Sequence, residues 1–101
     1  MKVAAIQYDI AWENRVPNHK RILELITASK LEPNTLVVLP EMFDTGFSMN
    51  PVKTIQSEAC ESELFLSDVA SEYDCCVVGG VVGRGITKKS SNEAAVFGTD
   101  G

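Results

Sequence analysis

The chain has 101 residues, of which 45% are hydrophobic, and these values suit one globular domain or a piece of one. Its formal net charge of −5 argues against nucleic acid and anionic membranes as partners, because both require clustered Lys and Arg. The sequence has no apolar run as long as a membrane-spanning helix, and segment 3–6 is too short for a secretory signal. A cytoplasmic location is therefore expected by default.

The first part of the chain predicts a strand, a helix and a second strand. Residues 2–8 are nearly continuous in apolar side chains, as expected for a strand that is covered on both faces. Asn14 suits a helix N-cap with Pro17 in the first turn, and an apolar stripe of helical period continues to about Lys30. Residues 35–39, with the sequence TLVVL, predict a second buried strand.

The second part predicts a long loop, a helix and two more strands. Residues 41–55 predict a connection of unusual length, and long ordered loops in compact domains tend to be functional. Residues 58–73 have the periodicity of a helix with one buried face, and residues 75–82 form a third apolar strand. Residues 92–98 predict a strand antiparallel to the third, because the connection is too short for a crossover. This βαβαββ order favours a layered α/β fold.

Glu41 is the main candidate for chemistry. It directly follows the second strand, and open α/β sheets bind their ligands at the carboxyl ends of their strands. Apolar neighbours should partly desolvate its carboxylate and make it a better base. The alternative is an ordinary exposed glutamate at a strand end.

Phe43 and Phe47 are candidates for substrate binding. Gly46 allows a bend in the loop that carries them, and the two rings could keep the crevice beside Glu41 dry. The same rings could instead pack the loop onto the core. His19, the single histidine, is expected to be structural or solvated.

The cysteines show no catalytic or metal-binding pattern. Cys60, Cys75 and Cys76 are odd in number and lack CxxC or Cys/His spacing, so no metal site is predicted. We expect them to be small buried hydrophobic residues. Cys60 has no activating base nearby in sequence, and the other two begin a strand at the sheet edge opposite Glu41. None of the three is assigned as a nucleophile.

Three segments of the chain are similar to a known family: KVAAIQYDIAWENRVPNHKRI, LPEMFDTGFSMNP and VVGG. Together they resemble the N-terminal part of the carbon-nitrogen hydrolase (nitrilase) superfamily, and MFDTGFSM is most similar to the ω-amidase branch. The resemblance runs from Val3 to Gly101 and implies amide hydrolysis by a Glu, Lys and Cys triad, with Glu41 as the general base. It also implies a four-layer αββα sandwich whose second sheet comes from later residues.

The same resemblance implies further properties of the whole enzyme. Its substrates would be small-molecule terminal amides of 2-oxo dicarboxylic acids, it would need no cofactor, and it would form a homodimer. Residues 1–101 would be one partial domain that stops before the catalytic Lys and Cys, so this segment alone would be inactive. The turn signal of Thr99, Asp100 and Gly101, with no strand after it, also suggests a longer polypeptide.

Two other functions remain open from the sequence. The chain could be a self-contained α/β binding module without chemistry, in which case both faces of the sheet should be covered. It could also be a truncated relative that associates with a full-length homologue, which predicts an exposed apolar sheet face.

Overall fold

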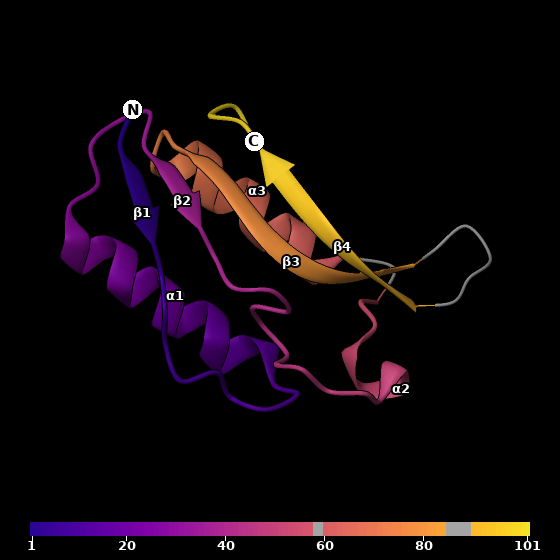
Figure 1. The fold of residues 1–101 in the computed structure, drawn as a ribbon. Coiled ribbons are helices and arrows are strands. Elements are labelled where there is room, and N and C mark those ends of the chain that lie inside the picture. Colours follow the sequence, from indigo (N-terminus) through magenta and orange to yellow (C-terminus); the bar gives the residue numbers. More distant parts are fainter. Residues whose placement is uncertain (58–59, 85–89) are drawn as a thin grey trace.

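The chain forms one four-stranded sheet with helices packed on one of its faces (Figure 1). The structure is a computed structural model, and it describes residues 1–57, 60–84 and 90–101. The elements are β1 (Val3–Ala5), α1 (Arg15–Ser29), β2 (Leu36–Val38), α2 (Pro51–Thr54), α3 (Glu61–Glu72), β3 (Cys76–Arg84) and β4 (Ser90–Phe97). Among these described residues, no helix is long and apolar enough to cross a membrane.

The strands lie side by side in chain order, β1-β2-β3-β4. The first three are parallel, and β4 is antiparallel to β3. Helices α1 and α3 provide the two crossovers between parallel strands. The predicted βαβαββ order and the α/β class are confirmed, with the short helix α2 added inside the predicted loop. The chain supplies a helical layer and one sheet of the expected sandwich.

The boundaries of α1 agree closely with the prediction. Asn14 is the N-cap, and Lys30 ends the helix in a left-handed conformation with φ of 50°. Helix α3 begins at Glu61, later than predicted, and residues 58 and 59 lie outside the described residues. At the end of the chain, the Gly101 N–H donates to the Gly98 carbonyl at 2.9 Å, which confirms the predicted turn.

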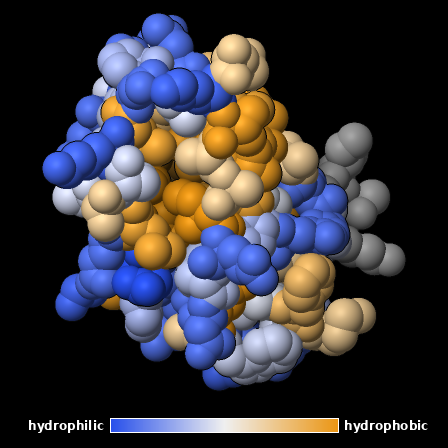
Figure 2. All heavy atoms as spheres, turned by 60° about the vertical axis from the view of Figure 1, so that its left-hand side comes forward, coloured by the Kyte–Doolittle hydropathy of each residue, from blue (hydrophilic) through white to orange (hydrophobic). Residues whose placement is uncertain are grey.

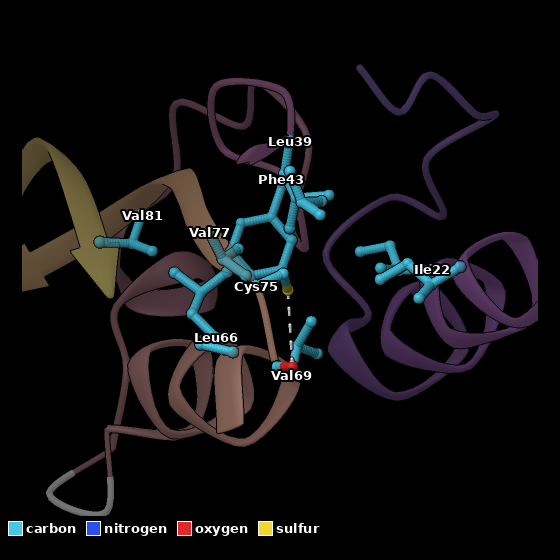
Figure 3. Close-up of a cluster of buried hydrophobic side chains, with 11 residues drawn as sticks. Ile22, Leu39, Phe43, Leu66, Val69, Cys75, Val77 and Val81 are labelled. Carbon is cyan, nitrogen blue, oxygen red and sulfur yellow. Dashed lines mark hydrogen bonds between the residues drawn. The ribbon is translucent and has the colours of Figure 1, made fainter. Parts of the chain in front are cut away.

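The buried core lies between the sheet and the two long helices (Figure 3). Ile22 of α1, Leu66 of α3 and Val77 of β3 are all fully buried. Phe43, from the loop after β2, is also fully buried and points into the same cluster. The loop is therefore part of the core, and its position is fixed by packing.

The cysteines differ in their surroundings. Cys75 is buried, and its thiol lies 3.8 Å from the Val69 carbonyl oxygen (Figure 3). Burial raises the pKa of this thiol, and the neighbouring Cys76 and Asp74 add to the rise. Cys60 is exposed, so the expectation that all three are buried was wrong for it. Cys60 is the N-cap residue of α3, and its side chain makes no capping hydrogen bond.

The other face of the sheet is open. Val3 of β1 is 59% exposed and Val96 of β4 is 68% exposed. Side chains alternate between the faces of a sheet, and by the register this open face includes Val3, Ala5, Leu36, Val38, Cys76, Val78, Ala94 and Val96. The expectation that the strands are covered on both faces was therefore wrong for this chain, because α1 and α3 lie on the same side.

Viewed from the side of β1 and α1, the surface shows a broad apolar area bordered by hydrophilic residues (Figure 2). A contiguous apolar surface of this kind is unusual on a finished globular domain and commonly marks a contact with another segment or chain.

Candidate active site

Glu41 lies at the carboxyl end of β2, as the sequence predicts. The pairing of β2 with β3 continues past the last β2 residue, because the Leu39 N–H donates to the Val78 carbonyl at 2.8 Å. The Gly80 N–H donates to the Pro40 carbonyl oxygen at 3.3 Å, and the Phe43 N–H donates to the Gly80 carbonyl oxygen at 3.1 Å. These backbone bonds bracket Glu41 and fix the turn that carries it.

Gly80 is required for this turn to pack against β3. A Cβ at position 80 would lie 2.6 Å from the Glu41 Cα and 2.8 Å from the Met42 nitrogen, and neither backbone atom can move freely. Met42 itself has φ of 48°, a left-handed conformation that is unfavourable for its side chain. The turn sends Phe43 into the core while the Glu41 side chain stays outside it.

The Glu41 carboxylate faces an open hollow of about 350 Å³. The lining residues come from the end of β2, from β3 and from β4: Val38, Leu39, Glu41, Val78, Gly79, Gly80, Asn92, Glu93 and Ala94. Within the part of the chain that the structure describes, one hydrogen bond reaches the carboxylate: the Asn92 side-chain amide donates to Glu41 Oε1. Glu41 is exposed. The expected desolvation is absent, because Leu39 and Phe43 are buried in the core beneath it.

The two phenylalanines have different positions. Phe43 is fully buried, with its ring centroid 6.0 Å from that of Phe65 and 6.0 Å from that of His19. Phe47 is 61% exposed. The hollow beside Glu41 is lined by neither ring in this structure. In the described part of the chain, Phe43 serves the alternative predicted for it, which is to pack the loop onto the core.

A buried carboxylate that no sequence pattern predicts lies three residues after Glu41. Asp44 is 1% exposed, and its Oδ2 accepts hydrogen bonds from Ser62 Oγ at 2.6 Å and from His19 Nε2 at 2.8 Å. The Arg15 Nε lies 3.4 Å from the same oxygen. The His19 ring stacks on Phe65 with centroids 4.0 Å apart. The structural role expected for His19 agrees with this geometry.

The contacts of Asp44 join the loop to both long helices. The Asp44 carbonyl accepts a bond of 2.8 Å from the Asn18 side-chain amide of α1. Arg15 also donates to the Thr54 carbonyl and, at 2.8 Å, to Ser62 Oγ. No sequence signal predicted this cluster, because its members are separated by many residues and meet only in the folded chain.

Ser62, His19 and Asp44 are the residue types of a hydrolytic triad, but their geometry differs from one. In a triad the histidine bonds the serine on one side and the carboxylate on the other. Here Ser62 and His19 both bond the same Asp44 oxygen, and Ser62 is fully buried. The cluster therefore anchors the loop, and Glu41 is the exposed carboxylate beside a hollow.

A family model described as carbon-nitrogen hydrolase matches residues 2–101. The chain belongs to the carbon-nitrogen hydrolase family. Two solved structures are similar to this carbon-nitrogen hydrolase chain over 97% of its length. One is XC1258 from Xanthomonas campestris, a superfamily protein with an arsenic adduct in its active site, with 19% identity and a TM-score of 0.84. The other is an N-terminal amidase with an Asn-Glu-Ala peptide, with 19% identity and a TM-score of 0.80.

Because both sequence identities are low, these similarities support the fold alone. The chain spans 36% of the XC1258 chain and 25% of the amidase chain. The search of curated proteins found no match.

Proposed function

We propose that these residues are the N-terminal part of a carbon-nitrogen hydrolase that cleaves non-peptide amide bonds, with Glu41 as its general base. The observation that carries this proposal is the position of Glu41, at the carboxyl end of a parallel strand and beside an open hollow. The family match includes this position. Glu41 is also free of the buried contacts that occupy Asp44, so it is accessible to a reacting group.

In the proposed reaction, Glu41 takes the proton of a cysteine thiol supplied by later residues, and the thiolate attacks the amide carbonyl carbon. A lysine from the same later part stabilises the resulting oxyanion. The protonated Glu41 then gives its proton to the leaving nitrogen, which departs as ammonia and leaves an acyl-enzyme thioester. Glu41 next takes a proton from water, and the water oxygen attacks the thioester carbonyl carbon. Protonated Glu41 then returns this proton to the leaving cysteine sulfur, which releases the acid and restores the thiol and the Glu41 carboxylate.

The substrate proposal is more specific. We propose terminal amides of 2-oxo dicarboxylic acids, because the MFDTGFSM segment is similar to the ω-amidase branch. The exposed ring of Phe47 is the aromatic side chain of this segment that a substrate could reach, and Phe43 would support the loop from beneath. A cytoplasmic location and a homodimeric full-length enzyme are parts of the same proposal.

The test is ammonia release from 2-oxoglutaramate. The full-length polypeptide, its Glu41→Gln variant and residues 1–101 alone would be assayed side by side. We expect ammonia from the full-length wild type only. Ammonia release by residues 1–101 would contradict the division of the triad, and full activity of Glu41→Gln would contradict the role of Glu41.

The open sheet face bears on the alternatives. A self-contained binding module should have both faces of its sheet covered, whereas Val3 and Val96 are exposed on the face opposite the helices. This observation argues against such a module. It agrees with a chain whose sheet packs on further residues, from the same polypeptide or from a full-length partner, and the ammonia assay separates these two cases.

A further inference from the structure

We infer that Asn92 is a positioning residue for Glu41 and holds one carboxylate oxygen so that the other is available for proton transfer. This inference rests on the proposed function. It starts from the hydrogen bond between the Asn92 amide and Glu41 Oε1, which joins residues that are far apart in the sequence.

The architecture of β3 and β4 makes this contact possible. Gly80 of β3 pairs with Ala94 of β4, and Val82 pairs with Asn92. Gly80 has no side chain and Ala94 has only a methyl group, so these two positions place no bulky side chain between Glu41 and β4. The Glu41 side chain can therefore pass over β3 and reach the Asn92 amide on the neighbouring strand.

The chemistry of the pair favours a positioning role. A carboxylate only accepts hydrogen bonds, so the NH2 group of Asn92, and not its carbonyl oxygen, must face Glu41. A carboxamide does not titrate in the working pH range, and it cannot compete with Glu41 for the thiol proton. It fixes the direction of Oε1 and leaves Oε2 free to receive that proton. A general base needs this geometry before its basicity matters.

Charge around the hollow also matters for this role. Among the described residues that line it, Glu41 and Glu93 are the titratable ones. The Glu93 carboxylate accepts a hydrogen bond from Ser91 Oγ. Asn92 is thus a neutral donor next to two acids. Replacing it with a third acid would place a second negative charge beside the Glu41 carboxylate.

The experiment compares three variants of the full-length enzyme with the wild type. Asn92→Ala removes the donor, and Asn92→Asp replaces it with a carboxylate of nearly the same shape. Ser90→Ala is the matched control, because Ser90 lies on the same face of β4, is exposed, and is outside the residues that line the hollow. The measurements are kcat, KM, the pH dependence of kcat/KM and thermal unfolding.

We expect Asn92→Ala to lower kcat by about 10- to 100-fold with little change in KM, as for loss of one hydrogen bond to a charged group. Asn92→Asp should lower it further and move the acidic limb of the pH profile about one unit upward, since a like charge disfavours the ionised base. Ser90→Ala should match the wild type.

Two outcomes would overturn the inference without touching the proposed function. The first is an inactive Glu41→Gln variant together with wild-type kcat in Asn92→Ala. The second is a loss of activity in Asn92→Asp with an unchanged pH profile, which would indicate a purely structural effect. An active Glu41→Gln variant would instead remove the proposed function itself.

Discussion

Glu41 and Asp44 belong to one loop, but their surroundings are opposite. Asp44 is 1% exposed and bonds Ser62 and His19, with Arg15 beside it. Glu41 is exposed, and Asn92 is the one described donor to its carboxylate. A carboxylate with several donors and a cation is fully satisfied, and it stabilises the fold. A carboxylate with one donor and an open hollow can still accept a proton or a ligand.

Under the proposed function, the loop assigns stability to Asp44 and chemistry to Glu41. The contacts of Asp44 and the burial of Phe43 fix the backbone on both sides of the turn. Glu41 can then remain exposed without making the turn loose. A rigid support beneath an accessible group is the arrangement that precise proton transfer requires.

The largest expected effect is on activity. Glu41→Gln keeps the shape of the side chain and removes its basicity, so kcat/KM of the full-length enzyme should fall by about 10²- to 10⁴-fold. Its free energy of unfolding should change by less than about 0.5 kcal/mol, because the side chain is exposed. Steady-state ammonia release and urea unfolding measure the two quantities. A large loss of stability in Glu41→Gln would show that the Glu41 carboxylate stabilises the fold, as the Asp44 carboxylate does.

The next effect is on stability. Asp44→Ala leaves the Arg15 guanidinium without its buried partner and should lower the free energy of unfolding by about 3–5 kcal/mol. Asp44→Asn is the matched variant, since it keeps the shape and one carbonyl acceptor, and it should cost less. Urea unfolding of the full-length protein would measure both. Equal stability of Asp44→Ala and the wild type would refute the anchoring role.

The sequence predicted one member of this pair of carboxylates and missed the other for a physical reason. Glu41 stands out in the sequence because it directly follows an apolar strand, which is a local signal, and its role as general base stays a prediction. Asp44 lies in an irregular stretch without periodicity, and its partners His19 and Ser62 are distant in sequence. Because of the same irregularity, the sequence did not decide whether the Phe43 ring lines a pocket or packs in the core.

Elements with a regular period were predicted better than contacts between them. The limits of α1 followed from a cap and an apolar stripe, and the antiparallel β4 followed from a short connection. The strand sequences alone did not predict that one face of the sheet is open. An apolar run indicates that a strand is suited to burial, but it does not reveal which element covers each face. The contact between Asn92 and Glu41 also depends on register, which the sequence does not encode locally.

A third effect tests the turn between the two carboxylates. Gly80→Ala should lower the free energy of unfolding by about 1–3 kcal/mol and also reduce activity, because the new methyl group meets the Glu41 backbone. Gly98→Ala is the control, because a Cβ at position 98 would meet Asp100 Oδ1 at 3.5 Å, which is an ordinary contact. If both variants behave alike, the close approach at Gly80 has no special role.

The smallest effect concerns Glu61, a carboxylate at the edge of the Asp44 cluster. Partial burial works against its charge, but hydrogen bonds from Ser57 and the charge of Arg15 outweigh this and lower the pKa of Glu61. A lowered pKa in the folded state adds stability above the usual pKa of glutamate, and this stability is lost as the pH falls through the folded-state pKa. Because Glu61 is 38% exposed, Glu61→Gln should cost at most about 0.5 kcal/mol at pH 7.

The difference between Glu61→Gln and the wild type should disappear in acid, once the carboxyl is protonated in both folded and unfolded chains. Glu63→Gln removes a charge from the same first turn of α3, so it controls for the interaction of that charge with the helix dipole. Urea unfolding at pH 7 and at acidic pH would measure all three proteins. A penalty for Glu61→Gln that persists in acid would mean that its contacts with Ser57 do not depend on charge. Glu61 would then resemble a neutral cap and would not belong to the ionic cluster around Asp44.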